Sequence, residues 1–180
     1  MIIEAALALA VDVAIVLAID VSGSMTEKSY ELQRTAIASA MEWEQFQMAS
    51  RTGPIGRIAV SVVQWSSQAY VAIPFTVLQF PYEFKEFAKK IDEMPRMENG
   101  STCAGKAMEF SLNHVLTQKE NAARLVVDVS GDGDENCFYA PQDGTPVNQM
   151  PAKQVRDIGV NLGVQFNGLP ICDDTTMQNI

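Results

Sequence analysis

Asp20-Val21-Ser22-Gly23-Ser24 directly follows the apolar run Val11-Asp12-Val13-Ala14-Ile15-Val16-Leu17-Ala18-Ile19. A run of this length that is rich in Val and Ile predicts a strand buried on both faces. In open α/β sheets, ligands bind beyond the carboxyl ends of the strands. The sequence therefore predicts that one carboxylate and two hydroxyl groups lie at the ligand-binding edge of a sheet.

Two later segments carry similar oxygen atoms: Thr102 opens a predicted helix, and Asp132 follows a predicted strand. Alternate residues of an extended turn point the same way, so the side chains of the first motif can converge. Two carboxylates and three hydroxyl groups form an all-oxygen set of low charge, which suits Mg²⁺ or Mn²⁺. We therefore predict a metal site made of Asp20, Ser22, Ser24, Thr102 and Asp132.

The rest of the chain alternates between predicted helices and strands. Apolar periodicity predicts helices near residues 27–50, 82–93, 101–116 and 152–157, and strands near 11–19, 57–65, 70–75, 124–130 and 160–169. The short connection at 66–68 makes its two strands antiparallel, and Pro74 favours an edge position for the second. We expect residues 11–180 to form one α/β domain: a Rossmann-like, doubly wound, mostly parallel sheet with one antiparallel edge strand and helices on both faces.

The first predicted helix carries an apolar stripe. Leu32, Ala36, Ala40 and Trp43 recur at helical spacing within residues 27–50. A stripe of this kind ordinarily faces the core of a globular protein. We therefore expect these four side chains to be buried, with Ile37, Met41 and Met48 beside them.

The composition argues against several classes of function. The formal net charge is −9, which argues against a nucleic-acid backbone or an anionic membrane surface as the main partner. His114 is the single histidine, and the three cysteines form no CxxC pair. A zinc site of the His or Cys type is therefore not expected. Because His114 lies in the middle of a predicted helix, we expect it to be structural.

The first ten residues leave two interpretations open. Ala8-Leu9-Ala10 resembles a signal-peptidase site, although no Lys or Arg precedes it, so residues 1–10 are either a leader remnant or an N-terminal extension of the first strand. Asp12 and Asp20 interrupt the apolar run, and a membrane span is therefore not expected. We expect a periplasmic or extracellular location, with a cytoplasmic location as the alternative.

Three motifs occur in an order that resembles the von Willebrand factor A (VWA) domain. They are Asp-x-Ser-Gly-Ser after a buried strand, Gly100-Ser101-Thr102 at the start of a later helix, and Asp132-Gly133 after the fourth strand. The resemblance covers roughly residues 11–170. Gly131 stands where Thr is common in that family. Together with Asn167-Gly168-Leu169-Pro170, it makes the sequence similar to a bacterial, functionally uncharacterised branch.

The resemblance implies a metal-ion-dependent adhesion site (MIDAS). In that family the three hydroxyl groups are ligands, and the two aspartates bind the ion directly or through water. The resemblance also implies a protein partner whose acidic residue completes the coordination. By extrapolation, the rim of the site is formed by Asp134, Glu135 and Asn136.

The length of the chain departs from the family pattern. VWA domains usually have a further strand and a last helix after the fifth strand, whereas this chain ends at Ile180. We expect that last strand and helix to be missing. The consequence would be an exposed apolar surface where the helix packs in the family.

The proposed ligands also fit ordinary structural roles. Ser24-Met25-Thr26-Glu27 fits a helix capping box, Thr102 alone fits a helix N-cap, and Asp132 alone fits a turn. The rival function is a metal-dependent hydrolase acting on phosphate esters, but Ser22 stands where such enzymes have a second acid. Because no nucleophile elbow or P-loop is present, we expect a non-catalytic, metal-dependent protein-binding module.

The cysteines leave a further choice. Cys103 adjoins Thr102, and Cys137 follows Asp132 by five residues, so both are expected near the same rim. Either they form a disulfide that joins two metal-bearing loops, or both are small buried side chains. With Cys172, the chain holds either one disulfide and one free thiol or three reduced thiols.

Overall fold

The computed structural model describes residues 11–97, 100–132, 137 and 150–171. Its sheet has five strands in the order β3-β2-β1-β4-β5. β2 pairs antiparallel with β3, and the other neighbouring strands pair in parallel. The strands are β1 (Val11–Asp20), β2 (Ile58–Trp65), β3 (Ala69–Leu78), β4 (Ala122–Gly131) and β5 (Val164–Pro170).

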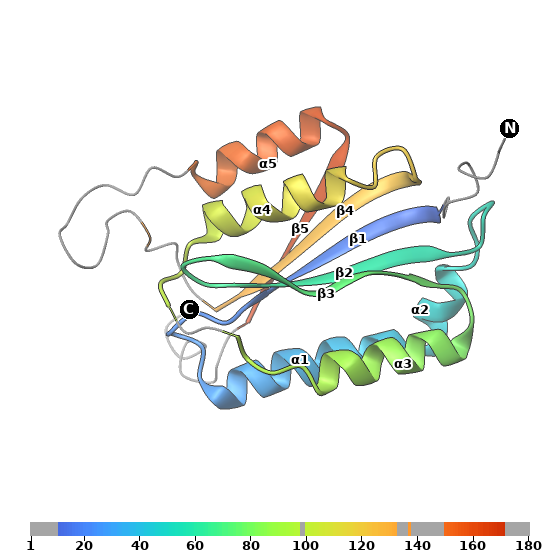
Figure 1. Cartoon of the computed structure of the whole chain (residues 1–180), viewed down its shortest axis with the longest axis horizontal. Coiled ribbons are helices and arrows are strands. Elements are labelled where there is room, and N and C mark those ends of the chain that lie inside the picture. The colour runs from blue at the N-terminus through green and yellow to red at the C-terminus, as the bar shows by residue number, and fades with distance from the viewer. Residues whose placement is uncertain (1–10, 98–99, 133–136, 138–149, 172–180) are drawn as a thin grey trace, which may run out of the picture.

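Helices cover both faces of the sheet (Figure 1). On one face lie α1 (Glu27–Glu42), α2 (Glu44–Ala49) and α3 (Pro81–Asp92), and on the other lie α4 (Ala104–Leu116) and α5 (Ala152–Asn161). The predicted doubly wound, mostly parallel sheet is confirmed, and β3, which contains Pro74, is its antiparallel edge strand. Because the other four strands are parallel, their carboxyl ends meet at one edge of the sheet.

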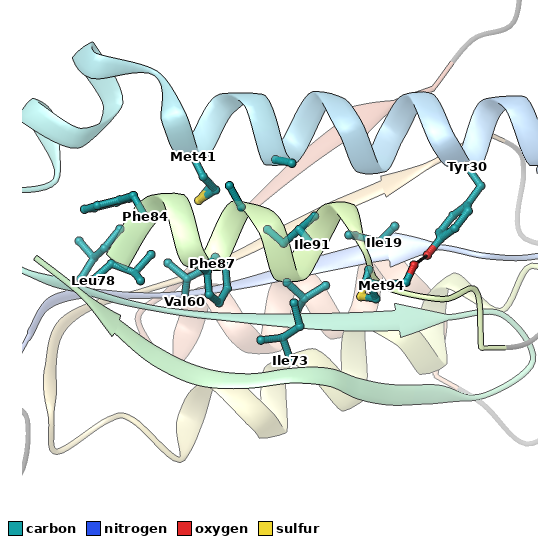
Figure 2. Packing of buried hydrophobic residues seen from close by; sticks show 14 of the residues in the cluster. Ile19, Tyr30, Met41, Val60, Ile73, Leu78, Phe84, Phe87, Ile91 and Met94 are labelled. Atoms are coloured by element: carbon teal, nitrogen blue, oxygen red, sulfur yellow. Dashed lines mark hydrogen bonds between the residues drawn. The ribbon is translucent and has the colours of Figure 1, made fainter. Parts of the chain in front are cut away.

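Two apolar clusters fill the space between the layers. Figure 2 shows the first, in which Tyr30 and Met41 of α1 and Phe87 of α3 pack over β1 and β2. In the second, Leu112 of α4 and Val155 of α5 pack on the opposite face. β1 therefore contributes to both clusters, as a strand buried on both faces should. Its last residue, at the carboxyl edge, is fixed by packing on either side.

The first helix differs from its prediction in two ways. A break at Trp43, whose backbone is extended, divides it into α1 and α2. The predicted inward stripe is wrong: Leu32, Trp43 and Met48 are 63%, 61% and 56% exposed, and Ala36 and Ala40 are exposed too. The helix is rotated because other side chains reach the sheet and α3; the buried residues of α1 are Tyr30, Gln33, Ala38 and Met41.

The end of the described chain also differs from its prediction. α5 continues to Asn161 instead of ending near residue 157, and β5 begins at Val164, after a turn in which Gly163 has a φ of +83°. The helix continues because Residues 172–180 lie outside the described residues, so the missing last strand and helix stay a prediction.

The α1 side of β4 and β5 is mostly polar in the described residues. Arg124 donates a hydrogen bond to Gln165, Gln165 to Asn167, and Asn167 to Asp128, and all three bonds are exposed. Leu169, at the end of β5, is 57% exposed. The apolar surface expected here is therefore small, because alternation along the two strands brings polar side chains to this face.

Candidate metal centre

The five predicted metal ligands meet at the carboxyl edge of the sheet. The hydroxyl oxygens of Ser22 and Ser24 are 3.1 Å apart, and Ser24 donates a hydrogen bond to Asp132 Oδ1 at 2.7 Å. Thr102 Oγ1 donates to Ser22 Oγ at 3.3 Å. Asp20 joins the cluster through Oδ1, which accepts from the Ser22 backbone N–H at 2.7 Å. Residues 80 and 108 positions apart thus contribute oxygen atoms to one cluster.

Helix capping does not explain these hydroxyl groups. The N-cap of α1 is Thr26, whose hydroxyl accepts from the Ser29 backbone N–H at 3.0 Å. The N-cap of α4 is Cys103, which makes no side-chain capping bond. The capping interpretations of Ser24 and Thr102 are therefore wrong. Both hydroxyl groups point instead into the cluster at the sheet edge.

Asp20 forms the buried end of the cluster. Its side chain has no exposed surface, and its Oδ2 has no hydrogen-bond partner within the described part of the chain. Burial raises the pKa of Asp20, the hydrogen bonds from Ser22 oppose this shift, and the charge of Asp132 adds to it. A buried carboxylate oxygen is costly unless a donor or a cation satisfies it. The unpartnered oxygen therefore fits a bound cation.

Gly131 keeps the space beside Asp20 open. A Cβ at this position would lie 2.8 Å from Asp20 Oδ2 and 3.1 Å from the Trp65 ring. A threonine, which is common here in the VWA family, would be too large beside these two residues. The departure from the family pattern at Gly131 therefore matches the packing of Trp65, which is 2% exposed.

The donor set determines which ions the cluster suits. Among the residues that the structure describes, no group of three or more His, Cys, Asp or Glu side chains is placed to hold a metal. This cluster has two carboxylates and takes its remaining oxygen atoms from hydroxyl groups. Such a set suits hard ions such as Mg²⁺ or Mn²⁺, which accept oxygen ligands and retain water.

Arg96 is a residue of this region that sequence reasoning missed. Its guanidinium donates hydrogen bonds to the carbonyl oxygens of Val21, Ser22 and Met25 at 3.0, 2.6 and 3.0 Å. It also lies 3.6 Å from the Glu27 carboxylate. A guanidinium offers five donors in a rigid plane, so one side chain can hold three carbonyl groups. Arg96 therefore fixes the backbone that carries the first three oxygen ligands.

Buried amides hold the surrounding segments in place. Gln64, at the end of β2, donates to the Pro95 carbonyl at 2.8 Å and accepts from the Met97 N–H at 2.8 Å. Gln33 of α1 donates to the Asp20 carbonyl at 3.1 Å. Gln64 thereby positions the residues on either side of Arg96, and Gln33 holds the end of β1. The signal for both was weak, because a glutamine inside an apolar pattern reads as an exposed residue.

A disulfide lies at the edge of the cluster. Cys103 and Cys137 are bonded, with Cα atoms 4.8 Å apart and a sequence separation of 34. The structure thus selects the first of the two interpretations left open by the sequence. The bond links the residue after Thr102 to the segment after Asp132. Residues 133–136, including the predicted rim residues, and Cys172 lie outside the described residues.

The single histidine does not join the cluster. His114 Nε2 lies 2.9 Å from Ser61 Oγ, and its ring stacks on Phe75 with centroids 4.7 Å apart. Ser61 donates to the Ile73 carbonyl at 2.7 Å, so His114 Nε2–H is the donor in the pair. Burial lowers the pKa of His114. These contacts agree with the structural role expected for His114.

A family match covers nearly the whole chain. Residues 10–180 match a family described as "Protein of unknown function (DUF1194)". The chain belongs to the DUF1194 family. No curated protein matches it. None of the helices of this DUF1194 chain that the structure describes has the length and apolarity needed to span a bilayer.

Solved structures resemble the DUF1194 chain in fold. Proximal thread matrix protein 1 from the mussel byssus, with a zinc-occupied MIDAS motif, superposes with a TM-score of 0.67 at 16% identity, covering 94% of this chain and 41% of that one. The pilus adhesin SpaC of Lactobacillus rhamnosus gives 0.61 at 13% identity, covering 89% and 24%. An aerotolerance-related membrane protein of Bacteroides fragilis gives 0.58 at 17%, covering 88% and 67%.

These likenesses show the fold and nothing finer. The DUF1194 chain spans less than half the length of the mussel protein it matches, at 38% and 41% in two of its structures. At such identities the residues of a site cannot be transferred by alignment. The VWA-like, doubly wound fold expected from the motifs is confirmed.

Proposed function

We propose that this DUF1194 chain is a divalent-metal-dependent protein-binding module of the adhesion type. Mg²⁺ or Mn²⁺ would be held by the five-residue cluster, and an acidic residue of a partner protein would complete the coordination. The observation that carries the proposal is the buried, unpartnered Asp20 Oδ2 beside converging hydroxyl groups. The roles of hydroxyl ligand and carboxylate ligand fall to Asp20, Ser22, Ser24, Thr102 and Asp132.

The chemistry of the cluster suits binding better than catalysis. The residue two positions after Asp20 is Ser22, so the second acid of a phosphoaspartyl hydrolase is not at that position. His114 is engaged with Ser61 in the apolar layer under α4. A general base must lie within hydrogen-bond reach of the reacting group, and His114 is instead held by these contacts. We therefore prefer a non-catalytic role to phosphate-ester hydrolysis.

An oxidising location is part of the proposal. The Cys103–Cys137 disulfide is typical of proteins that leave the cytoplasm. Structural neighbours include a byssus matrix protein and a pilus adhesin, which are extracellular by their names. We propose a periplasmic or extracellular, bacterial protein on these grounds. The acidic net charge of −9 supports a protein partner rather than a nucleic acid.

Calorimetry tests the metal site directly. The wild-type chain is expected to bind Mg²⁺ and Mn²⁺, and Asp20→Ala is expected to abolish binding. Asp128→Ala is a matched control, because Asp128 is a carboxylate on β4 whose partner is Asn167, outside the cluster. Equal binding by wild type and Asp20→Ala would refute the site. Metal-dependent turnover in a phosphatase panel, lost in Asp20→Ala, would instead establish the hydrolase.

A further inference from the structure

A cavity lies beside the candidate metal centre, on the face of the sheet covered by α4 and α5 (Figure 1). Its volume is about 430 Å³, within the range of about 300–1,000 Å³ found for ligand pockets. Its lining is mainly apolar and includes Met108 of α4, Val129 of β4 and Phe166 of β5. Each of these three side chains is half-buried, so part of each is accessible from outside.

The cavity and the metal centre share a wall. Trp65 and Gly131 line the cavity, and the same two residues border the carboxylate of Asp20 at the distances given above. Because Trp65 is 2% exposed, its ring is held firmly between the two sites. A protein segment that brings a carboxylate to the cluster therefore has this cavity next to it.

The charge around the cavity favours an acidic segment. Arg156 is the one charged side chain among the described lining residues. It pairs with Asp157 at 2.6 Å, and both side chains are about half-exposed, so the pair contributes little energy and rearranges easily. Together with a bound cation, Arg156 would attract an acidic segment and repel a basic one.

We propose that this cavity binds a large apolar side chain, of the Leu, Met or Phe type, that lies close in the partner's sequence to the acidic residue that binds the metal. This inference rests on the proposed function. An acidic residue alone is common on protein surfaces and gives little selectivity. A second, apolar contact at a fixed distance distinguishes the partner from other acidic segments.

Gly168 offers a way to fill the cavity without disturbing the fold. It lines the cavity, and no atom lies within 4 Å of the position that its Cβ would occupy. Strand alternation places it on the same face as Phe166, and a side chain in a strand interior is favoured over glycine. Gly168→Leu therefore closes the cavity. Ala40→Leu adds similar bulk to an exposed position of α1 and serves as the control.

The test is a selection of random displayed peptides on the immobilised full chain in Mg²⁺, with elution by a chelator. The enriched peptides are expected to carry Asp or Glu with Leu, Met or Phe at a constant spacing. Their affinity is expected to fall at least about tenfold for Gly168→Leu, which excludes the apolar side chain. It is expected to stay unchanged for Ala40→Leu. Calorimetry should show the same Mg²⁺ binding for all three proteins.

The outcomes separate the cavity from the metal site. Acidic peptides without an apolar preference, no enrichment by a chain that binds Mg²⁺, or unchanged affinity for Gly168→Leu would each overturn the role of the cavity and leave the metal site intact. Capture of the same peptides in chelator would show that the cavity acts without the metal, which also overturns the proposal. A wild-type chain that fails to bind Mg²⁺ would overturn the proposed function itself.

Discussion

Arg96 Nη2 lies 2.6 Å from the carbonyl oxygen of Ser22 and donates a hydrogen bond to it. Hydrogen bonds that involve a charged group contribute about 1.5–3 kcal/mol each, and Arg96 makes such bonds to three carbonyl groups. Its own position depends on Gln64, which bonds to the backbone on either side of it. The loop that follows β1 is thus oriented from the opposite side of the sheet edge.

Replacing Arg96 is expected to weaken metal binding more than it weakens the fold. Arg96→Lys keeps the charge but cannot hold three carbonyl groups with one ammonium. We expect Mg²⁺ affinity to fall about tenfold, and further for Arg96→Met, because one lost charged hydrogen bond corresponds to about that factor. Calorimetry measures the affinity, and Lys89→Met, at an exposed position of α3, is the control. Unchanged affinity in both Arg96 variants would contradict this role.

Asp20→Asn is expected to separate stability from binding. Burial raises the pKa of Asp20, so its ionised form is disfavoured in the folded chain without metal. Asparagine is neutral and retains an oxygen that accepts from the Ser22 N–H. In chelator, the variant is therefore expected to melt at a higher temperature than wild type. Added Mg²⁺ should raise the melting temperature of the wild type alone. A lower melting temperature of the variant in chelator would argue against this account of Asp20.

Reduction of the Cys103–Cys137 bond is expected to reduce both stability and metal affinity. Closing a loop of this length stabilises a chain by about 2–4 kcal/mol. The bond also connects the segments that carry Thr102 and Asp132, so its loss should let these two oxygen ligands separate. Urea unfolding and Mg²⁺ titration with and without a thiol reductant measure the two effects. The Cys103→Ala/Cys137→Ala double variant should match the reduced protein and show no further response to the reductant.

His114 gives the fold a defined dependence on pH. Its pKa in the folded chain is lowered by burial, below the value of about 6.5 for the unfolded chain. As the pH falls below that value, the unfolded chain takes up a proton that the folded chain does not, so stability decreases. Above it, both states are neutral and this contribution is constant. His114→Gln should remove this part of the acid-side loss of stability, as measured by chemical unfolding between pH 7 and pH 5.

Asp12 is expected to affect stability without affecting metal binding. Its carboxylate accepts hydrogen bonds from the backbone N–H groups of Ile55, Gly56 and Arg57 at 3.1, 2.6 and 3.3 Å. Asp12→Ala leaves these donors unsatisfied, with a cost of about 1–3 kcal/mol each where they stay buried. Because Asp12 lies at the start of β1, far along the strand from Asp20, Mg²⁺ affinity should be unchanged. A matched loss of affinity would show that the two ends of β1 are coupled.

The candidate cluster could be predicted because its signal is local. A buried strand, a Gly between two serines and a following helix determine where Asp20, Ser22 and Ser24 lie. Parallel strands bring their carboxyl ends together, which adds Asp132. The order of the motifs identified Thr102, although a threonine before a helix is ambiguous by itself. The hydrogen bonds among the hydroxyl groups then follow from the topology of the sheet.

The residues that support the cluster could not be predicted, because their roles depend on tertiary contacts. Arg96 lies in a polar loop of unremarkable sequence, and its three acceptors are 75, 74 and 71 positions away in the chain. Gln33 is buried on α1 because it bonds to the Asp20 carbonyl. The sequence stripe through Leu32 and Trp43 pointed to the wrong face for the same reason: a polar residue with a partner took the inward position.

The hydrogen bond from Ser24 to Asp132 joins residues 108 positions apart, and this has a consequence for how the chain folds. β4 must pair with β1 before these two side chains can meet, and contacts so distant in sequence form slowly because a long loop has to close first. The cluster is therefore assembled late, after most of the sheet. A partner that recognises it distinguishes finished molecules from folding intermediates.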